Sequence, residues 1–253
     1  MRRVAFFTGL MLMTLAFFAC KKEEDGTAQL KVYLTDAPGN FEHVFIDIQE
    51  VRIHSNNGGW TSLPINAGVY DLLEFNNGMD TLLCNVELPV GRISQIRLVL
   101  GNSNSVVVDG TTHSLTTPSA QTSGLKLNLH QELEANESYS IWLDFDAGSS
   151  VVLTGNGEYI LKPVIRTFSD LTNGKIKGIV TPMNAIPTVY AIQNGDTLTA
   201  IPDNNGFFMF CGVNGTYDVH IVPSVTGYST AEVNGVQASF GTITDLGTIQ
   251  IPN

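Results

Sequence analysis

Three aspartates are the strongest candidates for chemistry in this chain of 253 residues: Asp36, Asp144 and Asp146. Residues two apart on an extended strand point the same way, so Asp144 and Asp146 are expected on the same face as Trp142. Carboxylates about 7 Å apart on such a strand could hold a calcium ion with help from Asp36, or could flank a glycosidic bond. The simpler alternative, which the sequence favours, is that Asp36 caps a turn and the strand carboxylates face solvent.

The remaining polar residues form no recognisable catalytic constellation. No two histidines are spaced as metal ligands usually are in a sequence. The chain also has neither a G-x-S-x-G nucleophile elbow nor a phosphate-binding glycine loop. The sequence therefore predicts a protein that is not an enzyme, with calcium as the one cofactor to consider. The alternative is a carbohydrate-active hydrolase that uses the strand carboxylates.

Two tryptophans could bind a glycan by stacking, as exposed aromatic rings do in many β-sandwiches. Trp60 follows the turn sequence Asn57-Gly58-Gly59, and Trp142 lies on the polar face of its strand. Either ring could instead cover the edge of a core. We favour that alternative for Trp142, because tryptophan is highly buried on average.

The first twenty residues have the layout of a secretory signal. Arg2 and Arg3 precede an uncharged run of sixteen residues from Val4 to Ala19, and Cys20 follows. This run is shorter than the ~20 residues that a membrane-spanning helix needs, so a cleaved signal peptide over residues 1–19 is expected. An ordinary signal with an incidental cysteine is the alternative, which is disfavoured because charged residues begin directly after Cys20.

The phrase Phe17-Phe18-Ala19-Cys20 resembles the lipobox of bacterial lipoproteins, in which an apolar residue and two small residues precede a lipidated cysteine. Phe18 departs from the small-residue preference. The resemblance implies that the mature chain begins at a lipidated Cys20 and that the lipid bilayer is its partner. One acyl chain binds only marginally, at ~0.8 kcal/mol per buried methylene, so two or three chains would make the anchor stable.

The charged run after the cysteine, Lys21-Lys22-Glu23-Glu24-Asp25, resembles the export signal of Bacteroidetes surface lipoproteins. The resemblance implies a place on the outer face of the outer membrane. The alternative is a solvated tether, since a short run of charge beside Gly26 needs no other explanation.

Two short phrases, Asp80-Thr81-Leu82 and Asp196-Thr197-Leu198, resemble the Bacteroidetes pattern for O-glycosylation. The resemblance implies sugars on Thr81 and Thr197. Patterns of three residues also arise by chance.

Composition limits the partners. The chain has 13 basic and 24 acidic residues, and removing Arg2 and Arg3 with the signal would change its formal charge from -11 to -13. Such a charge repels phosphate backbones, which excludes nucleic acid as a partner. Cys84 and Cys211 are expected to be buried thiols, with a disulfide between the two halves as the alternative.

Apolar residues alternate along the chain and turn signals recur, which predicts an all-β fold of two β-sandwich domains. Strands are expected around Leu30–Leu34, Val44–Ile53 and Tyr159–Ile165, among others, with a bulge near Gln49-Glu50 where the alternation changes phase. A single helical turn is expected within Val69–Phe75. After the signal peptide and a lipidated tether (20–27), the expected domains are residues 28–169 and 170–253.

Several phrases of the first domain resemble the DUF4382 family of bacterial surface and secreted proteins. They are Leu34-Thr35-Asp36-Ala37-Pro38, Leu88-Pro89-Val90-Gly91, Ile96-Arg97-Leu98, Trp142-Leu143-Asp144-Phe145-Asp146-Ala147 and Leu161-Lys162-Pro163-Val164-Ile165. The resemblance covers about residues 28–168 and implies no activity, because the family carries none that is known.

The second domain resembles the carboxypeptidase regulatory-like domain, a transthyretin-like β-sandwich. The matching phrases are Gly178-Ile179-Val180-Thr181-Pro182, Pro202-Asp203-Asn204-Asn205-Gly206-Phe207-Phe208, Gly215-Thr216-Tyr217-Asp218-Val219 and Gly227-Tyr228. The resemblance implies a spacer or partner-binding module. The sequence as a whole predicts a non-catalytic surface lipoprotein that binds or displays a glycan or an envelope protein, with a structural subunit of an outer-membrane assembly as a further alternative.

Overall fold

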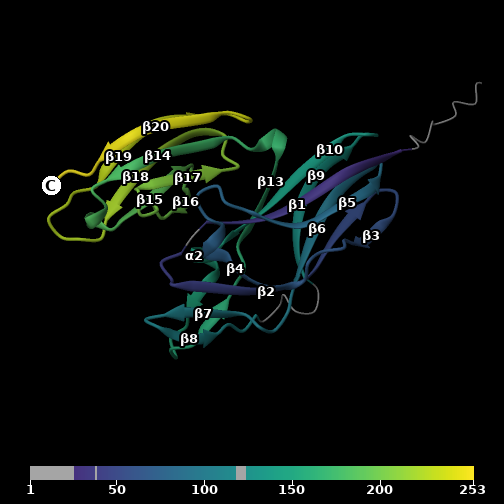
Figure 1. Ribbon diagram of the computed structural model, residues 1–253, viewed down its shortest axis with the longest axis horizontal. Coiled ribbons are helices and arrows are strands. Elements are labelled where there is room, and N and C mark those ends of the chain that lie inside the picture. Colours follow the sequence, from purple (N-terminus) through teal and green to yellow (C-terminus); the bar gives the residue numbers. More distant parts are fainter. Residues whose placement is uncertain (1–25, 38, 118–123) are drawn as a thin grey trace, which may run out of the picture.

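The computed structural model describes residues 26–37, 39–117 and 124–253 and shows an all-β chain (Figure 1). The first part contains strands β1 (Thr27–Ala37), β2 (His43–Ser55), β3 (Gly59–Ser62), β4 (Gly68–Asp71), β5 (Thr81–Pro89), β6 (Gly91–Leu100), β7 (Ser105–Val108), β8 (Thr111–Ser114), β9 (Leu125–Leu133), β10 (Ser138–Asp146), β11 (Val151–Leu153), β12 (Tyr159–Leu161) and β13 (Ile165–Ser169). The second contains β14 (Lys175–Thr181), β15 (Pro187–Gln193), β16 (Asp196–Ala200), β17 (Phe207–Cys211), β18 (Gly215–Pro223), β19 (Ala231–Ala238) and β20 (Ile243–Gln250). The helical pieces are η1 (Leu72–Phe75), α2 (Ala147–Ser150), η2 (Asp170–Thr172) and η3 (Met183–Ala185).

Strands β1 to β13 form the first sandwich. One sheet has the order β13-β10-β1-β5, and the other has the order β8-β7-β2-β6-β9 with β3 and β4 paired to β2. Strand β1 lies parallel to β10 and antiparallel to β5. Leu30, Val32 and Leu34 on β1 are fully buried in the core between the sheets, as their alternation predicted.

The predicted bulge in β2 is confirmed. The register between β2 and β6 shifts between Ile48 and Glu50, so that Ile48 and Val51 are both fully buried despite their odd spacing. A bulge is the way a strand keeps its apolar side chains inward when the sequence changes phase.

The prediction of one strand over Tyr159–Ile165 is wrong. The chain there forms β12 and β13, separated by residues 162–164. Pro163 has no backbone N–H to give to a ladder, and the Val164 N–H donates instead to the Ser150 hydroxyl at 2.8 Å. The helical turn expected within Val69–Phe75 is present as η1, after strand β4.

Strands β14 to β20 form the second sandwich, with sheets of order β17-β14-β20 and β16-β15-β18-β19 around a separate core. Figure 1 shows it at the upper left of the view, with α2, β2, β7 and β8 of the first sandwich below it. The turn η2 lies in the connection from β13 to β14. Within the described part of the chain, no helix is long and apolar enough to cross a membrane.

Candidate functional site at the junction of the two sandwiches

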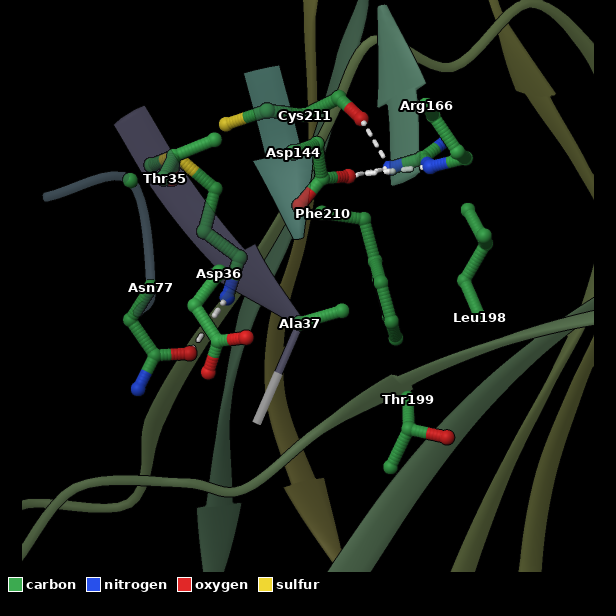
Figure 2. Close-up of a pocket in the computed structure, with 12 residues that line it drawn as sticks. Thr35, Asp36, Ala37, Asn77, Asp144, Arg166, Leu198, Thr199, Phe210 and Cys211 are labelled. Atoms are coloured by element: carbon green, nitrogen blue, oxygen red, sulfur yellow. Dashed lines mark hydrogen bonds and ion pairs between the residues drawn. The ribbon is translucent and has the colours of Figure 1, made fainter. Parts of the chain in front are cut away.

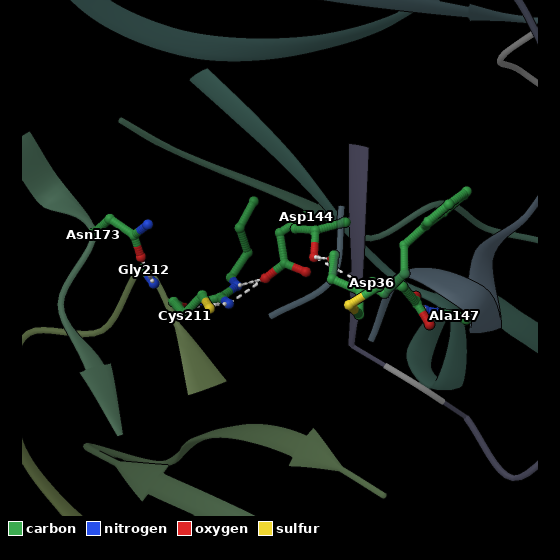
Figure 3. Close-up of polar contacts among 10 residues, drawn as sticks. Asp36, Asp144, Ala147, Asn173, Cys211 and Gly212 are labelled. Atoms are coloured by element: carbon green, nitrogen blue, oxygen red, sulfur yellow. Dashed lines mark hydrogen bonds and ion pairs between the residues drawn. The ribbon is translucent and has the colours of Figure 1, made fainter. Parts of the chain in front are cut away.

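The two sandwiches meet where β1 and β10 end and β13 begins. Side chains of the first sandwich and of the connection form hydrogen bonds with backbone groups of the second sandwich there. The Asn77 side chain donates to the Ile201 carbonyl at 2.9 Å. It also accepts from the Met209 N–H at 3.2 Å (Figure 2). The Gly212 N–H donates to the Asn173 side chain at 3.1 Å (Figure 3). These bonds connect the two sandwiches at two separate places, one at Asn77 and one at Asn173.

The central polar contact of the junction is the ion pair between Asp144 on β10 and Arg166 on β13. Arg166 donates through Nε to Asp144 Oδ2 at 2.9 Å and also through Nη2, and the same Nη2 donates to the Cys211 carbonyl at 3.2 Å. The Asp144 side chain is 5% exposed and that of Arg166 is 33% exposed. Burial raises the pKa of Asp144, and the Arg166 guanidinium opposes that rise.

A second buried carboxyl, that of Asp36, lies beside this pair at the end of β1. Its Oδ1 accepts from the Ala147 N–H at 3.0 Å, while its Oδ2 has no hydrogen-bond partner. Burial raises the pKa of Asp36 well above its ordinary value, and the bond from Ala147 opposes the rise, whereas repulsion by Asp144 and Asp146 adds to it. The junction therefore contains one buried carboxylate that is paired with an arginine and one, Asp36, whose pKa is raised by burial with no cation beside it.

A cavity of about 20 Å³ lies between the sandwiches and is lined by both aspartates, Arg166, Asn77 and Cys211 (Figure 2). A single water molecule needs roughly 10–15 Å³, so the cavity has room for a water molecule or a small ion. It is far below the roughly 300 Å³ at which small-molecule pockets begin. The buried carboxylates consequently have no cleft in which a sugar ring could lie.

The three aspartates that the sequence singled out do not surround one point. Asp36 and Asp144 line the cavity, but Asp146 accepts from the Ser149 N–H at 2.7 Å and caps α2. Across the described residues, no group of three or more His, Cys, Asp or Glu side chains could hold a metal ion. The expectation that the strand carboxylates face solvent is also wrong for Asp144, which the second sandwich and Arg166 cover.

We expect calcium to leave the thermal stability unchanged, because Arg166 already neutralises Asp144 and Asp146 is used as a cap. The measurement is the melting temperature in chelator and in millimolar calcium. An ion present at 100 times its dissociation constant would stabilise the fold by ~2.7 kcal/mol, or roughly 5–10 °C for a chain of this size. A rise of that size in calcium alone would contradict this expectation and restore an ion site.

The family model described as "Domain of unknown function (DUF4382)" matches residues 27–163, just over half of the chain. The chain belongs to the DUF4382 family. Among solved structures, the Bacillus anthracis TIE protein is similar at 10% identity over 90% of this chain and 35% of its own, with a TM-score of 0.25. BcpA, the major pilin subunit of Bacillus cereus, is similar at 12% identity over 89% of this chain and 70% of its own, with a TM-score of 0.21. The chain thus spans about a third of the first of these structures, and no curated protein matches it.

In this DUF4382 protein, Trp142 has both ring faces covered. It stacks on Tyr33 at 5.2 Å between centroids and on Phe168 at 5.4 Å, and its indole N–H donates to Asp80 at 2.7 Å. A sugar needs a free ring face for stacking. The structure therefore gives Trp142 a packing role in place of the glycan-binding role that the sequence allowed.

Trp60, on β3, is 36% exposed. The Arg97 guanidinium lies 4.2 Å from its ring centroid, and His54 meets it edge-on at 5.2 Å. A cation over an aromatic face contributes about 0.5–1 kcal/mol at an exposed site. Trp60 remains a candidate for glycan contact through its exposed part, in competition with Arg97.

The other predicted sites are dispersed. Thr81, the first residue of β5, is half-buried, and Thr197 on β16 is exposed, so an attached sugar fits the surroundings of Thr197 better. Cys20 and the run Lys21-Lys22-Glu23-Glu24-Asp25 lie outside the described residues. Cys84 and Cys211 are free thiols, and burial raises the pKa of each to about 11.

Three junction residues were not anticipated: Arg166, Asn77 and Asn173. Asn77-Gly78 carries the signal of a turn, which the structure confirms, whereas Arg166 follows the predicted strand 159–165 and lies inside β13 in the structure. Their bonds to the second sandwich join residues 39 to 132 positions apart. A local pattern contains no information on such pairings.

Proposed function

We propose that this DUF4382 protein is a lipid-anchored, surface-exposed and non-catalytic module that holds its second sandwich away from the membrane for binding or display. The supporting observation is the course of β1. The strand leaves the tether at Thr27 and reaches the junction at Ala37 (Figure 1). Ten residue steps of a strand extend about 33 Å, so the start of β1, next to the tether, lies far from the residues of β1 that line the junction cavity.

The hydrogen bonds of the junction support the display role. The bonds from Arg166, Asn77 and Asn173 involve backbone groups of β17 and its flanking residues. Arg166 and Asn77 also line the small cavity of the junction. A connection secured at several separated points resists hinge motion more than a linker alone. The second sandwich is then carried in one orientation, which suits the presentation of a binding surface to a glycan or an envelope protein.

The surroundings of the carboxylates also support a non-catalytic role. A glycosidase needs two carboxyl groups on either side of a sugar, about 5 Å or more apart with substrate between them. Here Asp144 is paired with Arg166, and the cavity that it shares with Asp36 is about 20 Å³. We propose a structural task for both residues.

The second sandwich is proposed to be the carboxypeptidase regulatory-like, transthyretin-like module that its phrases resemble. Its seven strands in two sheets, with a separate apolar core, support that assignment. Such a module would act as a spacer or partner-binding unit at the distal end of the protein.

Lipidation is tested by growing cells with a palmitate analogue. We expect label on the protein and its recovery with the outer membrane, and we expect Cys20→Ser to lose the label and the membrane association together. Two or three acyl chains hold a protein far more tightly than one, so the loss should be close to complete. Wild-type protein without label would overturn the proposed anchor.

Surface exposure is tested separately with protease on intact cells. Replacing Glu23, Glu24 and Asp25 with alanine is expected to protect the protein from cleavage while it stays labelled. Unchanged cleavage would mean that the acidic run is a tether and no export signal.

A further inference from the structure

A larger cavity, of about 310 Å³, opens at the end of the first sandwich that is remote from the junction. Its apolar lining comes from both sheets and consists of Ile53, Leu88, Pro89, Val90, Ile93 and Leu133. Ile53, Ile93 and Leu133 are at most 4% exposed and belong to the core cluster. The cavity is therefore an opening into the core between the two sheets.

The chemistry of this cavity suits a neutral hydrocarbon chain. None of its eleven lining residues is charged, and the polar ones are neutral side chains such as Ser55, Asn57 and Thr61. A free fatty acid would bring a carboxylate that needs a partner when buried. A chain whose head group is an amide or ester carries no such cost, and it restores the dispersion contacts that an open apolar cavity lacks. The volume lies at the lower end of the roughly 300–1,000 Å³ of small-molecule sites.

The position of the cavity indicates which molecule could supply that hydrocarbon chain. The Val90 N–H, on a residue that lines the cavity, donates to the Gly26 carbonyl at 3.1 Å. Six residue steps lead from Gly26 to Cys20, a reach of at most about 20 Å. A short tether raises the effective concentration of an attached group into the millimolar range. Acyl chains on Cys20 would thus be concentrated at this opening.

We propose that one acyl chain of lipidated Cys20 occupies this cavity, while the remaining chains enter the bilayer. This inference rests on the proposed lipid anchor. It deepens the proposed function, because a chain bound here would hold the anchor end of the first sandwich against the membrane surface. The second sandwich would then point outward from a fixed base.

The test uses lipidated protein from cells fed a fatty acid that carries a diazirine near its methyl end. The protein is reconstituted into vesicles of phosphatidylethanolamine and phosphatidylglycerol, irradiated and digested for mass spectrometry. We expect intramolecular cross-links to peptides that contain residues 53–61, 88–93 or 133. Label on the protein with cross-links only to vesicle lipid would overturn the cavity proposal and leave the anchor standing. Protein without any label would mean that the proposed anchor itself fails.

A matched pair of substitutions tests the cavity directly. Thr61 lines its rim and Thr111 lies on β8 away from it, and both are exposed strand residues. Thr61→Phe should occupy the opening and lower the cross-link yield roughly tenfold, the equivalent of about 1.4 kcal/mol. Thr111→Phe should leave the yield unchanged, and equal yields in the two variants would contradict the proposal.

The Cys20→Ser variant tests whether the acyl chain in the cavity comes from Cys20 or from membrane lipid. It is mixed with vesicles whose phospholipids carry the same diazirine acyl chain. Few cross-links to the cavity are expected, because the tether no longer concentrates a chain there. Yields as high as those of the lipidated protein would assign the cavity to membrane lipid and overturn the assignment to Cys20.

Discussion

Replacing Arg166 with methionine is expected to lower the free energy of unfolding by about 3 kcal/mol, the scale of removing one partner of a buried ion pair. The variant leaves Asp144, 5% exposed, without a countercharge, and it removes the bond to the Cys211 carbonyl across the junction. Urea unfolding of the Cys20→Ser protein, which needs no detergent, provides the measurement. The loss should grow as pH rises, because Asp144 without Arg166 is tolerated in the fold only when it is protonated.

Arg92→Met is the matched control. Arg92 also pairs with a carboxylate, Glu132, but at 3.6 Å and with side chains that are 44% and 66% exposed. Exposed pairs contribute about 0–1 kcal/mol, so this variant should stay within that range. Adding Asp144→Asn to Arg166→Met should recover part of the loss, since the uncompensated charge is then gone. Equal losses for Arg92→Met and Arg166→Met would show that the junction pair is no stronger than a surface pair.

Local patterns in the sequence predicted most of the longer strands and one irregularity. The alternation of apolar residues along β1 and β10 determines which side chains point inward, because the period of a strand is two residues. The change of phase at Gln49-Glu50 predicts the bulge for the same reason. Strands β3, β4, β5, β8, β9, β11 and β19 were not anticipated, although Leu125, Leu127 and Leu129 on β9 alternate as strand residues do.

The junction could not be predicted in the same way, because it depends on contacts between distant segments. The alternation of apolar residues along β10 correctly predicted that Asp144 lies on the face opposite the core of the first sandwich. That face was expected to be exposed to solvent. The second sandwich covers that face, and the parallel pairing of β1 with β10 brings Thr35 opposite Asp144 across 109 positions. Arg166 is the one residue in the sequence that points to a partner for Asp144, because it is cationic. It can be recognised as that partner only when the pairing of β13 with β10 is already known.

Asp36→Asn is expected to stabilise the protein at neutral pH, by about 1–3 kcal/mol, the cost of a buried group with an unsatisfied atom. The asparagine can still accept the Ala147 N–H through its oxygen, and it places an NH₂ group where the unpartnered Oδ2 lies. It also removes a negative charge beside Asp144, whose pKa is raised by its own burial. Urea unfolding of both proteins at several pH values gives the comparison.

The pH dependence identifies the cause of this gain. The pKa of Asp36 is raised in the folded chain above the ordinary value of about 3.9. Its contribution to the free energy of unfolding is therefore fully present below pH ~3.9 and is lost as the pH rises through the raised pKa. The advantage of Asp36→Asn should therefore be small near pH 4 and should grow toward neutral pH. Asp47→Asn is the control, because Asp47 is equally buried but accepts from the Ser103 N–H at 3.1 Å and from Gln49, and its loss should destabilise. If Asp36→Asn destabilised at every pH as well, the free oxygen of Asp36 would have to be holding a water molecule or ion that the fold needs.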